Sequence, residues 1–308
     1  MLSLINYLYN YHEKIIPGFL ICMTLGCTHQ INSGVSITPK KFKVQIPFIL
    51  NGRGIIINTY WGAEKTHHVL CIDNYSPSWI KEPLIKYNNS FSVSKGNTFR
   101  TSTADGTPIQ GKIGICDSLT FENVTFLKAP FYIMPPNAAD DKNDDGVFGS
   151  ELMSKGIWKI DFKRNELTFT SDIDSLQGVT QTETFPSIFN DQSIKINVEF
   201  GNNIVKTMAI DLGFNGELMM PLKEFDKLSN RNRAISGPAR FSTPGSDQNV
   251  NSLMIFDTVN INHNWFFAVI SSNETVRERL IGLQFFRRFD FVIFDFINKR
   301  IYVPKKIW

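Results

Sequence analysis

Two aspartates, Asp73 and Asp211, each follow an apolar run with the character of a β-strand. Val69-Leu70-Cys71-Ile72 precedes the first and Met208-Ala209-Ile210 precedes the second. Two carboxylates a few ångströms apart cannot both ionise at low cost, so they share a proton and titrate as a unit. Such a pair can activate a water molecule without a metal ion or a covalent nucleophile. The chemistry therefore depends on whether the fold brings these two side chains together.

The two aspartates lie at equivalent places in an internal repeat. The repeat has three landmarks: an apolar strand running into an aspartate, an aspartate that opens a strand pair, and two hydrophobic residues before a glycine. They fall at Asp73, Asp117 and Gly149 in the first copy and at Asp211, Asp257 and Gly282 in the second. The first two landmarks are 44 and 46 positions apart, and the first and third are 76 and 71 apart. A single aspartate after a strand is usually a turn or cap residue, but this recurrence favours a duplicated site.

The elements that must position the two aspartates are mostly strands. In residues 194–200, buried-type and polar side chains alternate with a period of two, which is typical of a half-buried strand. Each copy ends in the pattern of a β-hairpin with a polar, Asn-centred turn, at 160–169 and 294–303. Only short stretches such as 221–228 and 283–288 have helical character. The sequence therefore predicts a mainly β protein of two homologous lobes related by a pseudo-twofold.

Composition supports packed cores and gives the domain bounds. Of the 308 residues, 42% are hydrophobic and 26 are Phe, while only 20% are charged, which argues against a disordered chain. The net charge of +3 is spread along the sequence, so we expect no nucleic-acid partner. We predict a signal peptide at 1–26, a tether at 27–41, an N-terminal lobe at 42–170, a polar linker at 171–191 and a C-terminal lobe at 192–308.

The N-terminal segment has the pattern of a secretory signal. Ile15 to Gly26 is mostly apolar but shorter than the ~20 residues that a spanning helix needs. Thr24-Leu25-Gly26-Cys27 resembles a bacterial lipobox, which implies that Cys27 is acylated and becomes the first residue of the mature protein. The alternative is ordinary cleavage nearby, with Cys27 incidental. We expect a lipid-anchored protein of the bacterial cell envelope, on the periplasmic or outer surface.

No metal site is expected from the remaining cysteines or the acidic stretch. Cys71 and Cys116 lie in apolar strand contexts and could pair in an oxidising compartment or remain two buried thiols. Asp141 to Gly146 matches the start of an EF-hand loop, but position twelve of that loop would be Leu152, which cannot ligate calcium. A solvated acidic loop is the better interpretation of this stretch.

The landmarks resemble the clan of aspartic peptidases that includes retroviral and pepsin-like enzymes, most closely the retropepsin-like bacterial proteins. In the second copy, residues 210–221 resemble the family's Asp-Thr-Gly motif with its following strand. Residues 279–286 resemble its later hydrophobic-hydrophobic-Gly segment and short helix. In the first copy the matches are at 73–78 and 145–149. Together the matches span about residues 42–170 and 192–305.

The resemblance implies two aspartic-peptidase-like β-barrel lobes in one chain, with Asp73 and Asp211 as the catalytic pair. One chain would then supply both aspartates, so a monomer suffices, no cofactor is needed, and the partner is a peptide or protein substrate. Residues 100–111 lie where the family's flap would be, and 240–250 are their counterpart. A flap of this type closes over an extended peptide and excludes water. The implied substrate-binding residues are Tyr75, Ser76, Gly213, Phe214, Asp105 and Gly106.

The chain departs from the family motif at both positions after Asp73 and at one position after Asp211. It has Asp73-Asn74-Tyr75 and Asp211-Leu212-Gly213 where the family has Asp-Thr-Gly. The family's Thr hydroxyls brace the two loops; Leu212 has no hydroxyl, and Asn74 could supply a different polar contact. Tyr75 carries a Cβ where glycine allows close approach. The sequence therefore supports an aspartic endopeptidase, with a catalytically impaired envelope lipoprotein that binds peptides or a partner between its lobes as the alternative.

Overall fold

The computed structural model describes residues 23–24, 34–52, 54–86, 88–103, 108–135, 144–190, 193–228, 230–243 and 246–305. Within these residues the chain is mainly β, as predicted. The helices described are short: α2 (Glu82–Ile85), α3 (Ser150–Met153), α4 (Leu222–Phe225) and α5 (Leu283–Phe286). None of the helices in these ranges is long and apolar enough to cross a bilayer.

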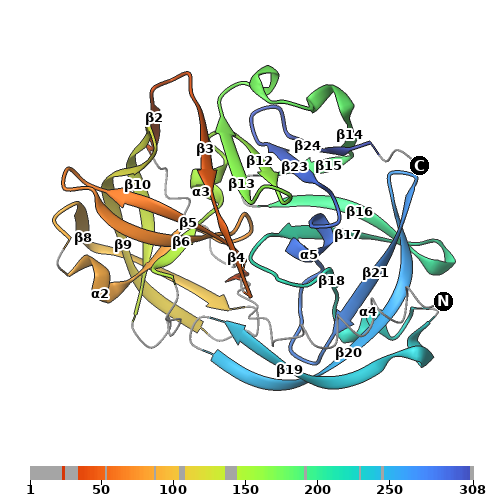
Figure 1. Ribbon diagram of the computed structural model, residues 1–308. Helices are drawn as coiled ribbons and strands as arrows, with labels where there is room; N and C mark the ends of the chain where they lie inside the picture. Colours follow the sequence, from red (N-terminus) through yellow and green to blue (C-terminus); the bar gives the residue numbers. More distant parts are fainter. Residues whose placement is uncertain are drawn as a thin grey trace.

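The first lobe is built on one sheet, which has ten strands in the described part of the chain (Figure 1). They are β1 (Met23–Thr24), β2 (Ser36–Thr38), β4 (Ile49–Asn51), β5 (Gly54–Trp61), β6 (Thr66–Ile72), β7 (Trp79–Lys81), β8 (Phe91–Thr103), β9 (Pro108–Phe121), β10 (Val124–Met134) and β11 (Gly146–Phe148). Their order is β1-β8-β9-β10-β7-β11-β6-β5-β4, with β2 paired to β10. A further pairing of β9 with β5 folds the sheet back on itself.

The second lobe repeats this topology. Its strands are β15 (Ser187–Phe189), β16 (Ile194–Phe200), β17 (Ile204–Asp211), β18 (Leu218–Met219), β19 (Ile235–Thr243), β20 (Ser246–Ile261), β21 (Asn264–Ser272) and β22 (Leu280–Gly282). Their order, β15-β16-β17-β22-β18-β21-β20-β19, is that of β4-β5-β6-β11-β7-β10-β9-β8. Even the extra pairing recurs, between β16 and β20. The predicted duplication of the lobe is therefore confirmed strand by strand.

A six-stranded antiparallel sheet joins the lobes. Its order is β14 (Thr182–Phe185), β24 (Arg300–Pro304), β23 (Phe291–Asp295), β12 (Ile157–Asp161), β13 (Glu166–Thr170) and β3 (Lys43–Pro47). Each half of the chain gives one outer strand and one closing hairpin. Lys159 of β12 pairs directly with Ile293 of β23, its equivalent in the repeat, so the pseudo-twofold axis passes between these two residues.

The segment predicted as a linker takes part in the sheets. It contains the 3₁₀ turns Ile173–Ser175 and Val179–Gln181 and then strands β14 and β15. Strand β14 occupies the place in the second half that β3 has in the first. Further 3₁₀ turns lie at Gly201–Asn203 and Arg231–Arg233. The domain bounds stay a prediction, but part of the linker belongs to the second lobe's own strands.

One hydrophobic core runs through both lobes and the joining sheet. Strand β16 illustrates how a strand contributes to this core: its residues alternate between buried and more exposed positions, as the period-two pattern predicts. Trp158 and Phe169 stack with their ring centroids 4.1 Å apart at the centre of the aromatic packing. Cys71 and Cys116 are both buried and form no disulfide. Of the two alternatives for these cysteines, the structure has the pair of buried thiols.

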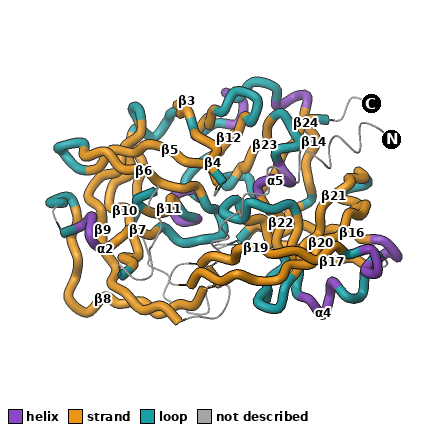
Figure 2. Tube along the Cα trace, turned by 60° about the horizontal axis from the view of Figure 1, so that its bottom comes forward, coloured by secondary structure: helices purple, strands orange, loops and turns teal. Residues whose placement is uncertain are grey.

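Two long hairpins, β8–β9 and β19–β20, extend on the side opposite the six-stranded sheet (Figure 1, Figure 2). They contain the predicted flap segments. Asp105 and Gly106 lie outside the described residues, as do Cys27 and the predicted signal peptide apart from Met23–Thr24. The expectation that Asp117 and Asp257 open strand pairs is wrong. Both lie inside the second strand of a long hairpin, because β9 and β20 run on to the turns at Glu122 and Asn262.

Candidate active site

Equivalent strands bring Asp73 and Asp211 to the interface of the lobes. Asp73 follows β6, which runs parallel to β11, and Asp211 ends β17, which runs parallel to β22. In each lobe the loop after the aspartate is then held by the segment after the parallel strand. The backbone N–H of Ser150 donates to the Ser76 carbonyl at 2.8 Å, and that of Leu283 donates to the Phe214 carbonyl at 2.8 Å.

The two carboxyl groups are buried and in contact. Asp73 is 1% exposed and Asp211 is 0% exposed, and the two side chains are hydrogen-bonded to each other. Asp73 Oδ1 also accepts the backbone N–H groups of Tyr75, at 2.9 Å, and Ser76, at 3.2 Å. Asp211 Oδ1 accepts the backbone N–H of Phe214 at 3.0 Å. Both carboxyl groups are thus fixed by backbone donors of their own loops.

Gly213 lies against both carboxyl groups. Its backbone N–H donates to Asp73. A Cβ at this position would lie 2.4 Å from Asp73 Oδ2 and 3.2 Å from Asp211 Oδ1, so any larger residue would displace the carboxyl groups. The φ of Gly213 is not in the left-handed region. Glycine is required here because of close approach and not because of backbone conformation.

Burial controls the protonation of this pair. It raises the pKa of Asp73 to about 6, because the charged form loses its hydration. Hydrogen bonds from Tyr75, Ser76, Asp211 and Gly213 favour the charged form and offset only part of this effect. The pair therefore holds a proton under mildly acidic conditions, as a dyad of adjacent carboxyl groups requires.

One amide side chain ties the two aspartate loops together across the lobes. Asn74 Nδ2 donates to the carbonyl of Ile210 at 2.9 Å, and the backbone N–H of Leu212 donates to Asn74 Oδ1 at 2.9 Å. Asn74 is 1% exposed, so both bonds are shielded from water. Leu212 needs no hydroxyl because Asn74 binds the backbone on either side of Asp211.

Tyr75 is accommodated without backbone strain. Its φ is not positive, and its half-buried side chain packs on a cluster of the second lobe. The buried members of that cluster are Ala209, Phe214, Met219, Val276 and Leu280. Tyr75 and Gly213 occupy equivalent positions, two residues after each aspartate. Gly213 has no side chain, so this contact between the lobes comes from the first loop alone. The site is asymmetric in spite of the duplicated strands.

Ser76 and Phe214, predicted to bind substrate, have buried positions in the structure. Ser76 is 0% exposed and Phe214 is 5% exposed. Their backbone N–H groups hold the two aspartates, and the Phe214 ring packs beside Gly216 and Gly282. These two residues are therefore placed to orient the carboxyl groups through the backbone, with their side chains facing the protein interior.

The sequence analysis missed Glu151, which lies beneath the first loop. Its Oε2 accepts the backbone N–H of Ser78 at 2.9 Å and the Ser78 hydroxyl at 3.1 Å, while the backbone N–H of Gly149 donates to the Ser78 hydroxyl at 2.9 Å. Burial raises the pKa of Glu151 to about 7. The sequence did contain a signal for this buried carboxylate, because Glu151 lies between the hydrophobic-hydrophobic-Gly segment and the apolar Leu152-Met153.

A second missed carboxylate, Glu217, lies in the other lobe, directly before β18. Its Oε2 accepts the backbone N–H of Val269 at 2.6 Å, and its Oε1 lies 2.9 Å from Arg288 Nη2. Glu217 is 8% exposed. Arg288, two residues after α5, is the ion-pair partner of this buried carboxylate.

The end of the acidic stretch is packed into the first lobe. Asp141 to Asn143 lie outside the described residues, but Asp144 is 5% exposed and Asp145 Oδ2 accepts the backbone N–H of Val69 at 3.0 Å. Asp145 Oδ2 also lies 3.2 Å from His68 Nδ1. The expectation of a solvated loop is wrong for these two aspartates, because Asp144 is buried and Asp145 connects the start of β11 to β6.

Solved structures with the same fold include an aspartic proteinase. The crystal structure of the aspartic proteinase from Irpex lacteus matches with a TM-score of 0.59 and 14% identity, over 86% of this chain and 98% of that one. Basic 7S globulin from soybean matches with a TM-score of 0.56 and 10% identity, over 86% and 95%. Comparison of the sequence with protein-family models and with curated proteins gave no match. The chain therefore has the pepsin-like fold of two lobes.

Proposed function

We propose that this protein is an aspartic endopeptidase whose catalytic pair is Asp73 and Asp211. The observation that carries the proposal is the mutual hydrogen bond of two buried carboxyl groups, one from each lobe, at equivalent places of a duplicated fold. The likeness to the Irpex lacteus aspartic proteinase supports the fold on which this chemistry depends.

The reaction follows from one proton shared between two carboxyl groups. The ionised carboxylate removes a proton from a water molecule as its oxygen bonds to the carbonyl carbon of the peptide. The protonated carboxyl group donates to the carbonyl oxygen, which gives a tetrahedral diol. Proton transfer to the peptide nitrogen then allows the C–N bond to break and releases an acid and an amine. Backbone N–H groups of Tyr75 and Gly213 orient Asp73 throughout.

The long hairpins suit an extended substrate. In this proposal β8–β9 and β19–β20 cover a peptide that lies across the dyad, and Asp105 and Gly106 contribute to binding it. Since one chain supplies both carboxyl groups, the working unit is a monomer. Residues of this chain supply the acid and the base, so the proposal invokes no cofactor.

The test is peptide hydrolysis by Asp211→Asn. The purified domain would be incubated with a mixed peptide library between about pH 4 and pH 7, and products would be identified by mass spectrometry. We expect loss of cleavage with an unchanged circular dichroism spectrum. Asp226→Asn is the matched control, because Asp226 is an exposed aspartate paired with Arg231. Undiminished cleavage by Asp211→Asn contradicts the proposal.

A second function, peptide or partner binding without hydrolysis, is favoured by the asymmetry at Tyr75 and Leu212. The soybean neighbour with the same fold is named as a globulin and not as a proteinase. A domain that binds library peptides but leaves them intact at every pH, in the native form and in Asp211→Asn alike, supports this second function.

We also propose that Cys27 is the lipidated first residue of a protein held at the surface of the bacterial envelope. The support is the sequence pattern of residues 15–27. Cells that express the full chain would be labelled with a radioactive fatty acid. Label is expected on the native protein and absent from Cys27→Ala, whereas equal labelling of both contradicts the lipid anchor.

A further inference from the structure

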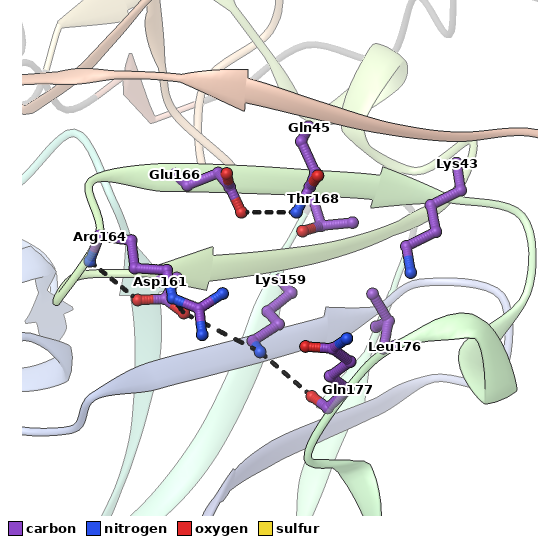
Figure 3. Close-up of a pocket in the computed structure, with 9 residues that line it drawn as sticks. All are labelled: Lys43, Gln45, Lys159, Asp161, Arg164, Glu166, Thr168, Leu176 and Gln177. Atoms are coloured by element: carbon purple, nitrogen blue, oxygen red, sulfur yellow. Dashed lines mark hydrogen bonds and ion pairs between the residues drawn. The ribbon is translucent and has the colours of Figure 1, made fainter.

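A polar cavity of about 140 Å³ lies on the outer face of the six-stranded sheet (Figure 3). Side chains alternate along β12, so Trp158 and Ile160 enter the main core while Lys159 and Asp161 face the other way. The cavity is therefore on the opposite face of the sheet from the main core. It is lined by Lys43, Gln45, Lys159, Asp161, Arg164, Glu166, Thr168, Leu176 and Gln177.

The carboxylates of this cavity are already occupied by neighbours in the protein. Asp161 Oδ1 accepts the backbone N–H of Arg164 at 3.0 Å, and its Oδ2 lies 3.8 Å from Arg164 Nε. Glu166 Oε1 accepts Gln45 Nε2 at 2.8 Å. Three cationic side chains, Lys43, Lys159 and Arg164, line the same space as these two carboxylates. The cavity therefore has more positive charge than its own acceptors balance.

Lys159 is the most buried of these cations. It is 9% exposed, and its Nζ donates to the carbonyl of Gln177 at 3.1 Å. The nearest carboxylate oxygen, Asp161 Oδ2, is 4.0 Å away, and the ring centroid of Phe291 is 4.2 Å away. An ammonium group can donate three hydrogen bonds, and a buried charge is costly unless it is paired and hydrogen-bonded. Desolvation lowers the pKa of Lys159 for this reason.

The other two cations keep donors directed at the same space. Lys43 Nζ donates to the Ser175 carbonyl at 2.6 Å, which uses one of its three protons. The guanidinium of Arg164 is 62% exposed at the rim and presents a planar set of donors. Both side chains line the cavity together with Lys159, so an oxyanion there would lie among three cations.

The duplicated half of the chain provides an internal comparison. Lys159 and Asp161 correspond to Ile293 and Asp295, which pair across the pseudo-twofold axis. Strand β14 takes the place of β3 at the outer edge of the sheet. Lys43 of β3 pairs with Thr170, and Thr182 of β14 pairs with the equivalent residue Pro304, so Thr182 is the counterpart of Lys43. The second half builds the same strands with an isoleucine and a threonine in place of the two lysines. The fold therefore does not require these lysines.

We propose that this cavity binds a small oxyanion, a phosphate or a carboxylate, between Lys159, Lys43 and Arg164. Lys159 forms the buried end of the site and Arg164 the rim. The site is separate from Asp73 and Asp211, and its occupation does not depend on peptide hydrolysis.

Titration of the full domain with inorganic phosphate, followed by nuclear magnetic resonance at constant ionic strength, tests the site. We expect saturable shifts at residues of β3 and β12, and an affinity reduced by about tenfold in Lys159→Met, since a charge-assisted hydrogen bond is lost. Lys163→Met is the matched control, because Lys163 is an exposed lysine of the adjacent turn that does not line the cavity. It should bind phosphate as the native protein does.

Parallel titrations with acetate and with phosphate distinguish the two ligand classes. Saturation by either one supports the site and names its ligand. If Lys159→Met does not fold, Lys43→Met, which removes another cation of the cavity, is used for the same affinity measurement. The absence of saturable binding of both anions overturns the proposal, and so does equal affinity of the native protein and a folded Lys159→Met or Lys43→Met variant. Peptide hydrolysis is not a readout of this experiment.

Discussion

The side chain of Asn74 in the first lobe accepts the backbone N–H of Leu212 in the second lobe at 2.9 Å. Its amide nitrogen donates to the carbonyl of Ile210 on the other side of Asp211. A single buried amide thus fixes the backbone that flanks the second aspartate from a position next to the first. This side chain therefore helps to hold the two aspartate loops at a fixed separation.

Removal of this amide should loosen both aspartates. In Asn74→Ala the N–H of Leu212 and the carbonyl of Ile210 lose their partner while remaining buried, and each such loss costs ~1–3 kcal/mol. We expect the free energy of unfolding in urea to fall by about 2–4 kcal/mol. If the dyad is catalytic, kcat should fall much more than KM rises.

The control for this variant is Asn197→Ala. Asn197 is an exposed strand residue that accepts one hydrogen bond from Thr207. Its removal should change the free energy of unfolding by about 0.5 kcal/mol or less. Equal effects of the two substitutions would show that Asn74 has no special place between the lobes.

Gly213→Ala should impair catalysis through a steric effect on the dyad. The new methyl group would start 2.4 Å from Asp73 Oδ2, so the carboxyl group must move. A displacement of ~1 Å in a catalytic group can cost about a hundredfold in rate. The measurement is kcat/KM for a peptide that the native protein cleaves. Gly52→Ala, where a Cβ meets nothing within 4 Å, should retain full activity; comparable losses in both would remove the steric explanation.

The repeat made most of the fold predictable, because each landmark lies in or directly after a strand and recurs with the equivalent strand in the second lobe. Asp73 and Asp211 were identified from their recurrence together with the resemblance to aspartic peptidases. The bracing by Asn74 was foreseen only as a polar contact. Its partners, Ile210 and Leu212, lie in the other lobe, and no local pattern determines which atoms meet across an interface.

Other features depend on burial that the sequence pattern does not specify. Strand β14 was assigned to a polar linker because its pattern is not apolar, yet it completes the joining sheet by pairing with β24. Lys159 lies within an apolar hairpin sequence, and its low exposure follows from the covering segment at Leu176 and Gln177. Carboxylates such as Glu151 look like surface residues until the tertiary fold covers them.

The protonation of Asp73 predicts both an activity profile and a stability profile. Since the pKa of Asp73 is about 6, the shared proton is lost above that pH, and hydrolysis should decline. The folded pKa exceeds the usual value of 3.8, so the folded state binds more protons between about pH 4 and pH 6. The free energy of unfolding therefore decreases as pH rises through this window, by on the order of 3 kcal/mol.

Asp73→Asn tests the stability part of this prediction. The variant lacks the titrating group, so urea unfolding at pH 7 should show it to be more stable than the native protein, with the difference absent near pH 3.5. Asp117→Asn, an exposed aspartate paired with Lys128, should follow the native profile. A pH-independent difference between Asp73→Asn and the native protein would mean that folding does not shift the pKa of Asp73.

Glu151 adds a second titration of the same sign at higher pH. Its folded pKa of about 7 lies above the usual 4.5, so its contribution to stability is complete below about pH 4.5 and is lost as pH rises to 7. Glu151→Gln keeps an oxygen acceptor for Ser78 and removes the charge. We expect the stability of Glu151→Gln to match that of the native protein near pH 4 and to exceed it at pH 8 by on the order of 3 kcal/mol in urea unfolding. Glu151→Ala, which also removes the acceptor, should be destabilised at both pH values. If the glutamine variant instead loses stability at pH 8, the carboxylate stabilises the loop as an anion and its burial does not control its charge.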